Sequence, residues 1–280
     1  IKMKIKDFVA LAIEEDIKDG DHSALACIPS DARGKAKLLV KEDGIIAGIE
    51  VAKEIFKAFD ESVVIEQILN DGDVVKYGDI AFYVEGYSQK LLGSERLVLN
   101  IMQRMSAIAT LTNKFVVEIG ELPTKILDTR KTTPLIRFLE KQAVKIGGGE
   151  NHRMGLYDMV MLKDNHIDFA GGIENAILKT KKYLADKNLN IKIEIETRDL
   201  NEVKEVLAIG GVDRIMLDNF SHEDLRTAVQ LIGDKYETEA SGGIKLSTVR
   251  GYAECGVDYI SSGALTHSVH NLDLSLKATD

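Results

Sequence analysis

The chain has 280 residues and a net charge of −9, with 45% hydrophobic and 29% charged residues, which predicts one large or two ordinary globular domains with an ample core. The acidic balance argues against nucleic acid as a partner, and no apolar run approaches the roughly 18 residues of a membrane span. Residues 1–17 lack the features of a signal-peptide cleavage site. Cys27 and Cys255 lie far apart and indicate reduced thiols in a cytoplasmic protein.

The first part of the chain mixes helical and strand-like segments without a regular repeat. Turn residues at Asp71-Gly72 and at 77–79 separate short alternating runs, a pattern typical of hairpins. We therefore expect an α+β domain here. Its expected elements are a helix over 6–17, strands over 34–42 and 44–50, and a helix over 51–59.

Residues 88–119 have the apolar spacing of one long helix. From residue 125 onward the pattern changes to alternating strands and helices, with helices such as 174–186 and 246–255. Repeated βα units imply right-handed crossovers and a parallel sheet, which can close into a barrel. The expected strands are 125–130, 159–164, 191–197, 213–219, 236–241 and 258–263.

Polar residues concentrate at the carboxyl ends of these six strands, whereas apolar residues occupy their beginnings. In barrel enzymes the carboxyl ends carry the active site, so a shared site is expected there. Six strands are fewer than the usual eight, which leaves closure of the barrel open at this point. The polar positions are Asp128, Arg130, Lys163, Glu194, Glu196, Asp218, Glu239, Ser241, Ser262 and Gly263.

Residues 128–166 hold seven basic and five acidic residues, a local net charge of +2 in an acidic chain. They also hold Gly147-Gly148-Gly149, which lets a backbone approach a neighbour closely. Basic side chains near such a turn suit a small polyanion, because they pair with carboxylates and phosphates. We expect a binding site for a small anionic substrate, not a nucleic acid.

Two carboxylates, Glu194 and Glu196, are two residues apart on one expected strand and therefore point to the same face. Asp218 ends the next strand and can join them. Hard carboxylate oxygens suit Mg²⁺, which binds through one or two carboxylates together with substrate phosphates. Without a His/Cys cluster zinc is not expected, and for each acid alone a salt bridge is an equally good interpretation.

Glycine and serine residues follow two consecutive strands, in 239–244 and 261–265. Backbone N–H groups in such loops, at the start of a helix, can hold a phosphate group. In barrels the loops after the last two strands often have this role, although a single Ser-Gly-Gly is an ordinary turn.

Several motifs together resemble one family. DTRKTTP (128–134), AVKIGGGENHRMGL (143–156) and LKDNH (162–166) are similar to the quinolinate phosphoribosyltransferases, the carboxylating nicotinate-nucleotide pyrophosphorylases. The similarity extends to SERLVLNIMQRMSAIAT (94–110), EASGGI (239–244) and GVDYISSGALTHS (256–268), and so covers most of the chain.

The resemblance implies an N-terminal α/β sandwich-like domain followed by a short, six-stranded parallel α/β barrel. The implied domains are 1–108, with 266–280 packing back on it, and the barrel over 109–265. The implied reaction joins quinolinate to 5-phosphoribosyl-1-diphosphate in NAD biosynthesis, with Mg²⁺ as cofactor. Nicotinate mononucleotide, diphosphate and CO₂ are the products.

The resemblance also assigns residues. It implies a homodimer in which Arg96 reaches the partner subunit's site, with assembly beyond the dimer open. Lys131, Lys163, Glu196 and Asp218 are the expected catalytic residues, and Glu196 and Asp218 the expected Mg²⁺ ligands. The other expected substrate contacts are Arg130, Thr132, His152, Arg153, Ser241, Gly242, Gly243, Ser262, Gly263 and Ala264.

The chain departs from the family pattern at two positions. Leu135 follows Thr-Thr-Pro where the family usually has glycine, and leucine strains the turn if that position requires a positive φ. Gln142 replaces a commoner tyrosine in the following helix. The roles of His166 and His267 stay open, since each also fits a hydrogen-bonded histidine in a turn.

Two other classes of function remain. Lys163 at a strand end also fits a Schiff-base aldolase, although no second lysine with a matching role is evident. A phosphometabolite-binding protein without catalysis is the third class, but no metal carboxylate or site cation is missing. Nicotinate phosphoribosyltransferases share the implied fold, and Arg96 with Arg153 favours quinolinate over nicotinate.

Overall fold

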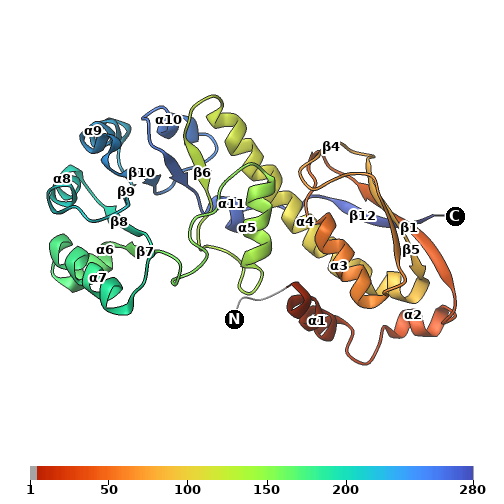
Figure 1. Cartoon of the computed structure of the whole chain (residues 1–280). Helices are drawn as coiled ribbons and strands as arrows, with labels where there is room; N and C mark the ends of the chain where they lie inside the picture. Colours follow the sequence, from red (N-terminus) through yellow and green to blue (C-terminus); the bar gives the residue numbers. More distant parts are fainter. Residues whose placement is uncertain (1–4, 280) are drawn as a thin grey trace. The chain divides into compact units, whose positions relative to one another are not determined.

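The computed structural model describes residues 5–279, which form two compact units (Figure 1). Unit 1 contains the described parts of Ile1–Asn113 and Thr266–Asp280 together with Thr132–Gly148, and unit 2 contains Lys114–Lys131 and Gly149–Leu265. The expected barrel range 109–265 was continuous, whereas the compact units assign Thr132–Gly148 to unit 1. Residues 1–4 and 280, which the expected ranges 1–108 and 266–280 include, lie outside the described residues.

Unit 1 is built on a four-stranded antiparallel sheet with the strand order β12-β1-β5-β3. Buried and partly exposed residues alternate along β1, as expected for a strand with one face on a core. β12 was not expected from the sequence, and it pairs with β1 over six residues. The strands of this sheet are β1 (Arg33–Val40), β3 (Val64–Gln67), β5 (Ile80–Tyr87) and β12 (Leu274–Thr279).

The expected hairpins around Asp71-Gly72 and 77–79 were wrong in their strand pairing. β3 pairs with β5, and the intervening β4 (Val74–Val75) pairs with β2 (Gly44–Ile45). The turn residues therefore mark chain reversals without joining paired strands.

The helices of unit 1 bury apolar stripes. In α3, for example, Ile49, Val51, Ala52, Ile55 and Phe56 are all buried, as the spacing of an amphipathic helix requires. The expected strand over 44–50 is shorter than predicted, because α3 already starts at Ile49. The helices are α1 (Ile5–Asp16), α2 (His22–Cys27), α3 (Ile49–Phe59), the part of α4 (Ser88–Ile119) up to Asn113, α5 (Arg137–Ile146) and α11 (Ala264–His267) from Thr266 on.

The Gly147–Gly149 turn follows α5 and lets this unit's own elements approach. A Cβ on Gly147 would lie 2.3 Å from the carbonyl oxygen of Ala109 and 2.8 Å from the Cβ of Thr112, both on α4. The packing of α5 against α4 therefore requires glycine here. The close backbone approach that the sequence predicted at this turn is between two helices of the protein.

Unit 2 contains a six-stranded parallel sheet with the order β6-β11-β10-β9-β8-β7. β6 and β7 form the two edges of this sheet, which matches the expected short, open barrel. All six expected strands are present, each shortened at one or both ends. They are β6 (Lys125–Leu127), β7 (Val160–Leu162), β8 (Ile193–Thr197), β9 (Arg214–Asp218), β10 (Glu237–Ser241) and β11 (Tyr259–Ser261).

Helices connect these strands, and β8 is buried along its whole length, as is typical of a parallel strand covered on both faces. Register places Glu194 beside Arg214, Met216 beside Glu239, and Asp218 beside Ser241. The helices are α6 (Asp164–Ala170), α7 (Ile173–Lys187), α8 (Leu200–Ile209), α9 (His222–Ile232) and α10 (Val249–Ala253).

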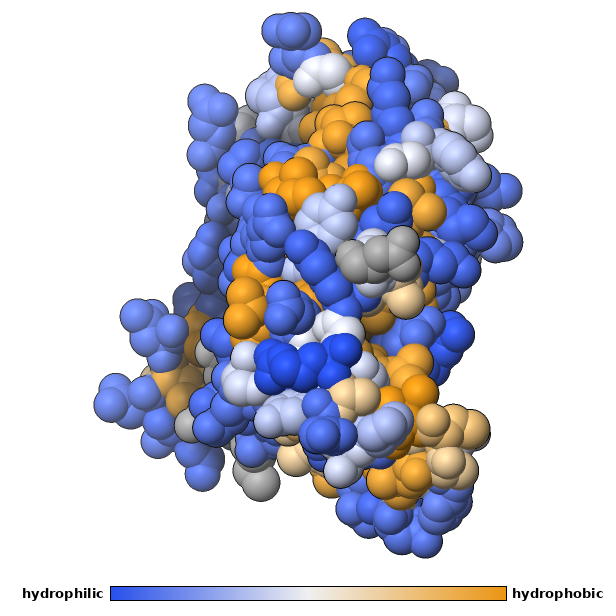
Figure 2. Space-filling model, turned by 90° about the vertical axis from the view of Figure 1, so that its right-hand side faces the viewer, coloured by the Kyte–Doolittle hydropathy of each residue, from blue (hydrophilic) through white to orange (hydrophobic). Residues whose placement is uncertain are grey.

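Figure 2 shows a face on which hydrophobic patches are interrupted by hydrophilic side chains. None of the helices within the described residues is both long and apolar enough to cross a membrane.

Candidate active site

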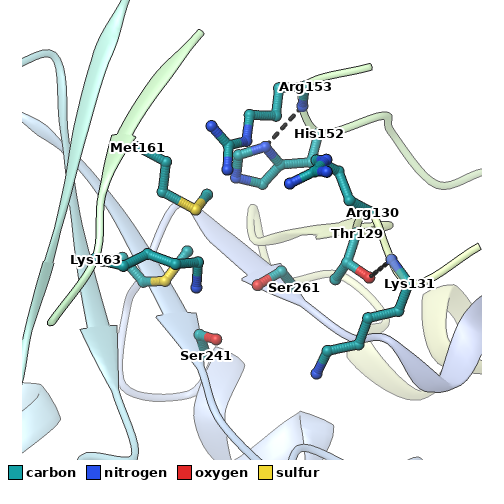
Figure 3. Close-up of a pocket in the computed structure, with 10 residues that line it drawn as sticks. Thr129, Arg130, Lys131, His152, Arg153, Met161, Lys163, Ser241 and Ser261 are labelled. Atoms are coloured by element: carbon teal, nitrogen blue, oxygen red, sulfur yellow. Dashed lines mark hydrogen bonds between the residues drawn. The ribbon is translucent and has the colours of Figure 1, made fainter. Parts of the chain in front are cut away.

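A cavity of about 330 Å³ lies in unit 2 and is lined from the carboxyl ends of several strands and the loops after them (Figure 3). Its volume falls in the range of small-molecule sites. Several strands contribute because the carboxyl ends of parallel strands lie at the same edge of the sheet. The lining residues are Thr129, Arg130, Lys131, His152, Arg153, Met161, Lys163, Met216, Ser241 and Ser261.

Four of these residues are cations: Arg130, Lys131, Arg153 and Lys163. Lys131 and Lys163 extend from opposite sides of the cavity, with Ser241 and Ser261 between them (Figure 3). Guanidinium and ammonium groups around one small cavity suit a ligand with several negative charges. The geometry therefore brings together two cations that the sequence placed at strand ends, Arg130 and Lys163, and two others of the stretch 128–166.

The cationic stretch 128–166 does not form a single cluster, however. Its other basic residues, Arg137, Lys141 and Lys145, lie on α5 in unit 1. Lys141 is completely buried there, and Arg137 Nε donates a hydrogen bond to Thr132 Oγ1 at 2.8 Å. Thr132 also belongs to unit 1 and is not among the cavity-lining residues.

Two carboxylates lie at the ends of neighbouring strands. Glu196 on β8 is buried and accepts a hydrogen bond from Lys163 Nζ at 2.9 Å. Asp218, the last residue of β9, is half-buried and accepts from Asn219 Nδ2 at 2.6 Å. Neither carboxylate lines the cavity, but the Glu196 ion pair directs the ammonium group of Lys163.

His152 and Arg153 are held from several sides. The His152 backbone N–H donates to buried Asp128, and the Arg153 backbone N–H lies 2.7 Å from His152 Nδ1 (Figure 3). The guanidinium of Arg153 donates to the carbonyl oxygen of Met159 at 3.1 Å. Both cavity-lining side chains therefore have defined orientations.

Behind the cavity, His152 contacts two acids that have no exposed surface. Its Nε2 lies 2.9 Å from Glu194 Oε2 and 3.3 Å from Glu239 Oε2. Arg214 Nη1 donates to the same Glu239 oxygen at 2.9 Å, and its guanidinium also pairs with Glu237. We call His152, Glu194, Glu239 and Arg214 the buried histidine network.

Burial and charge shift the pKa values in this network. Burial, reinforced by the charge of Glu239, raises the pKa of Glu194 to about 7. Burial also favours the neutral form of Glu239, but His152 and Arg214 hold its pKa below the ordinary value. For His152 burial lowers the pKa, and the two carboxylates outweigh burial and raise it to about 9.

The positions of Arg214 and Glu239 within their strands could have identified both residues from the sequence. Arg214, Glu237 and Glu239 are charged residues inside strands expected to be buried in a parallel sheet, where charge is unusual. Glu239 was noted only as one of many polar strand ends, and Arg214 was missed.

The expected phosphate loops differ from the prediction in one respect. Gly242 and Gly243 have φ values of 100° and 60°, so no right-handed helix can start there, and α10 begins only at Val249. A Cβ on Gly242 would lie 2.2 Å from Asn219 Oδ1, which explains the glycine. The expected helix start directly after this loop was wrong.

The second loop leads directly from Gly263 into α11 (Ala264–His267), which has only four residues. Ser262 is buried, and its hydroxyl donates to the carbonyl oxygen of Ile244 at 3.1 Å. The serine that lines the cavity is the preceding residue, Ser261. Thr129 is a further lining residue that the sequence did not single out.

The remaining expected or open positions lie outside the cavity lining. Arg96 is exposed on α4 in unit 1. His166 Nδ1 accepts a hydrogen bond from the Lys163 backbone N–H at 3.0 Å, and His267 Nδ1 lies 2.6 Å from Ser268 Oγ. Both histidines thus have the local partners of turn histidines. Leu135 has a φ of 68°, the conformation that glycine adopts without strain.

The donor set can be tested against a divalent cation. Glu196 and Asp218 offer hard oxygen atoms at adjacent strand ends, and one oxygen of each has a single hydrogen-bond donor. This fits Mg²⁺, which takes few protein ligands and completes its shell with phosphate and water. His152, Glu194 and Glu239 also lie within 4.8 Å of one another, but Arg214 already supplies a positive charge to Glu239 there.

Unit 1 contains a larger cavity of about 630 Å³ between α1 and α3. It is lined by both signs of charge, Lys6 and Lys57 with Glu54 and Glu61, around apolar residues. The cavity in unit 2 is smaller but lined by like charges at the carboxyl edge of a parallel sheet, and it is the candidate active site.

An open parallel α/β barrel with a cationic pocket at its carboxyl edge defines a protein that binds a small polyanion. Comparison with known families gives the particular group. Residues 21–106 match the quinolinate phosphoribosyl transferase N-terminal domain and residues 108–277 match the C-terminal domain of the same family. The chain belongs to the quinolinate phosphoribosyl transferase family.

Individual relatives agree. The chain is 49% identical to the chloroplastic carboxylating nicotinate-nucleotide pyrophosphorylase of Arabidopsis thaliana, over 98% of this chain and 82% of that protein. It is 43% identical to the probable carboxylating nicotinate-nucleotide pyrophosphorylase of Bacillus subtilis, over 95% and 90%. The crystal structure of NadC from Streptococcus pyogenes is similar over 100% of both chains, with a TM-score of 0.93 and 38% identity.

Proposed function

We propose that this protein transfers the phosphoribosyl group of 5-phosphoribosyl-1-diphosphate to quinolinate, with loss of CO₂. The products are nicotinate mononucleotide and diphosphate, which places the enzyme, a pentosyltransferase, in NAD biosynthesis. The observation that carries this proposal is the cavity with four cations in a chain of this family. Two carboxylates of quinolinate and the phosphates of the second substrate require such a surplus of positive charge.

We propose binding roles for the four cavity cations and for the two glycine-containing loops. Arg130 and Arg153 suit the carboxylates of quinolinate, because a guanidinium pairs with a carboxylate through two parallel hydrogen bonds. Lys131 and Lys163 suit the diphosphate, which develops negative charge as it leaves. Ser241, Ser262 and the backbone of Gly242, Gly243, Gly263 and Ala264 are the proposed 5-phosphate contacts, and Thr132 remains a proposed substrate contact that the family resemblance implies.

The reaction needs positioning more than a reactive side chain. The pyridine nitrogen attacks C1 of the ribosyl group as the C1–O bond to diphosphate breaks, and C1 is cationic in the transition state. The nearby carboxylates Glu196 and Asp218 stabilise that charge electrostatically. Loss of CO₂ then leaves an electron pair beside the pyridinium nitrogen, which the pyridinium charge and the cationic pocket favour, and a proton replaces the carboxyl group.

We propose Mg²⁺ as the cofactor. Glu196 and Asp218 would hold the ion together with substrate phosphates, and when bound it would neutralise the charge of the leaving diphosphate. The ion pair between Lys163 and Glu196 at 2.9 Å joins the lysine to this acidic group.

A homodimer and a cytoplasmic location complete the proposal. Arg96 is exposed on unit 1 and is available for a partner subunit's site, as the family resemblance implies. Both cysteines, Cys27 and Cys255, are free thiols, which supports a reducing compartment. Mixing inactive Arg96→Ala and Arg153→Ala subunits tests the dimer: mixed dimers should recover activity, and no recovery in verified mixed dimers contradicts a shared site.

The Schiff-base alternative finds little support. Such a reaction needs a neutral lysine amine, whereas Lys163 Nζ is ion-paired with the buried carboxylate of Glu196. Trapping with borohydride and a carbonyl substrate would revive that alternative if it produced a covalent adduct at Lys163.

The experiment that tests the proposal measures CO₂ and nicotinate mononucleotide from quinolinate and 5-phosphoribosyl-1-diphosphate, with and without Mg²⁺. Metal-dependent formation of both products in equal amounts is expected. Turnover of nicotinate without turnover of quinolinate would contradict the assigned carboxylate pocket. Binding of both substrates without turnover would favour a binding protein.

A further inference from the structure

The candidate site includes His152, but the residues that orient this histidine lie behind the cavity and have no assigned role. Glu194 and Glu239 are completely buried, and Arg214 is 7% exposed. Burying two carboxylates against one another costs free energy unless they are paired. Their common neighbour is the imidazole of His152.

Strand register explains how these side chains meet. Glu194 lies beside Arg214 on the adjacent strand, and Met216, two residues further on, lies beside Glu239. Because side chains two apart share a face, Glu194, Arg214 and Glu239 point to the same side of the sheet as the cavity-lining Met216 and Ser241. The network therefore lies on the pocket side of the sheet.

Both nitrogen atoms of His152 have partners within the protein. Nε2 faces Glu194 Oε2 at 2.9 Å and Glu239 Oε2 at 3.3 Å. Nε2 can donate a proton to these oxygens in the neutral or the charged ring. Nδ1 accepts the hydrogen bond of the Arg153 backbone N–H at 2.7 Å, a contact that requires the neutral ring and so opposes the two carboxylates, which raise the pKa of His152.

The same contacts act on Arg153. Its backbone N–H is fixed to the imidazole, and its guanidinium reaches the carbonyl oxygen of Met159 and lines the cavity. Burial and the neighbouring charge of Arg130 lower the pKa of Arg153, whereas the negative charge of Glu194 opposes this effect. Glu194 thus supports the orientation of a cavity cation, through His152, without lining the cavity itself.

We propose that Glu194 and Glu239, held by Arg214, are positioning residues that fix the imidazole of His152 and, through it, Arg153 in the geometry that binds the carboxylates of the substrate. This inference rests on the proposed function for the identity of the substrate. In this proposal His152 lines the pocket with its ring in a fixed orientation, and both ring nitrogens face protein groups.

Removing the nearer of the two carboxylates that face Nε2 should weaken binding more than chemistry. For Glu194→Leu we expect kcat/KM for quinolinate to fall about 10- to 100-fold, mostly through KM, because a small misplacement of a binding group is costly. Glu194→Gln retains an acceptor oxygen and should stay within about threefold of the wild type. Glu237→Gln is the matched control, since Glu237 pairs with Arg214 and Lys192 but not with His152.

These variants separate positioning from a merely structural role. A structural role predicts that Glu194→Leu lowers thermal stability while KM and kcat per folded molecule stay at the wild-type values, and that result would overturn the proposal. A loss of activity in Glu194→Gln or in the control Glu237→Gln as large as that in Glu194→Leu would overturn it as well.

A second measurement needs neither substrate nor activity. In protein labelled with ¹⁵N-histidine, the Nε2 proton of His152 should give a protected, slowly exchanging NMR signal, assigned by its absence in His152→Gln. That signal should persist in Glu194→Gln and exchange much faster in Glu194→Leu, where only Glu239 Oε2 at 3.3 Å remains beside Nε2. A His152 ring without a proton on Nε2 would contradict the proposal, whereas a wild-type protein inactive with quinolinate would contradict only the proposed substrate.

Discussion

Glu140 and Glu194 are both fully buried carboxylates, one in each unit, but their surroundings differ. Glu140 accepts hydrogen bonds from Arg104 Nε and Nη2 at 3.0 and 2.9 Å, and from the backbone N–H and hydroxyl of Thr133 at 3.0 and 2.9 Å. Arg104 also donates to the carbonyl oxygen of Thr266. We call Arg104, Glu140 and Thr133 the buried turn network.

Glu194 lacks such a set of donors. His152 Nε2 is within ion-pair distance of Oε2, but neither Oε1 nor Oε2 accepts a hydrogen bond of good geometry among the described residues. A second buried acid, Glu239, lies close by and raises the pKa of Glu194. Fully paired buried charges are typical of structural networks, whereas under-paired ones with shifted pKa values cluster at functional sites. The comparison therefore predicts different consequences of mutation in the two units.

The largest effect is expected at the pocket itself. Lys131→Ala should lower kcat/KM about 10²- to 10³-fold, because it removes a cation from the leaving diphosphate. The free energy of unfolding should change by less than about 0.5 kcal/mol, since Lys131 is exposed. Steady-state kinetics and urea unfolding measure both quantities. Lys145→Ala, an exposed lysine on α5, is the control, and normal turnover by a folded Lys131→Ala would refute the assigned role.

In the buried turn network the main effect should be on stability. Glu140→Ala should lower the free energy of unfolding by about 3–5 kcal/mol, because it leaves Arg104 without its charged partner. Urea denaturation measures this, with Glu140→Gln as a milder variant that keeps an acceptor. If the free energy of unfolding fell by less than about 1 kcal/mol, this would contradict the distinction between the buried turn network and the buried histidine network.

A smaller effect is expected at Leu135, in the turn that the buried turn network holds. A leucine at φ 68° is strained by about 1–2 kcal/mol, and the side chain is 69% exposed. Leu135→Gly should stabilise the protein by about 0.5–1 kcal/mol, after the larger entropy of glycine in the unfolded chain is subtracted. Leu135→Val should destabilise it. Thermal unfolding ranks the stability of the wild type and the two variants. A Leu135→Val protein as stable as Leu135→Gly would contradict the inferred backbone strain.

The smallest effect belongs to a surface ion pair, which sets the scale for the buried ones. Lys182 Nζ and Asp186 Oδ2 are 2.7 Å apart on α7, with side chains 76% and 57% exposed. Asp186→Ala should change the free energy of unfolding by less than about 0.5 kcal/mol, because water and salt screen the pair. A cost comparable to that of Glu140→Ala would show that burial does not explain the difference.

The sequence predicted unit 2 better than unit 1, and for a physical reason. In βα repeats each strand is buried on both faces, and strands that follow one another in the chain are usually neighbours in the sheet. The period and spacing of apolar residues therefore predicted the strand positions to within a few residues. In unit 1 strand pairing depends on distant partners. β12 pairs with β1 across most of the chain, and β3 pairs with β5 instead of forming the hairpins that local turn residues indicated.

The sequence by itself determined the six parallel strands, the site cations at their carboxyl ends, the family, and the unusual leucine after Thr-Thr-Pro. These features are local or repeat along the chain, so they can be read from spacing and motif. Only the tertiary structure decided that the cationic stretch divides between two units, that Ser261 and not Ser262 faces the cavity, and that Gly147 serves helix packing. It alone brought His152 to Glu194, Glu239 and Arg214, because strand register, which no single segment encodes, sets which buried charges meet.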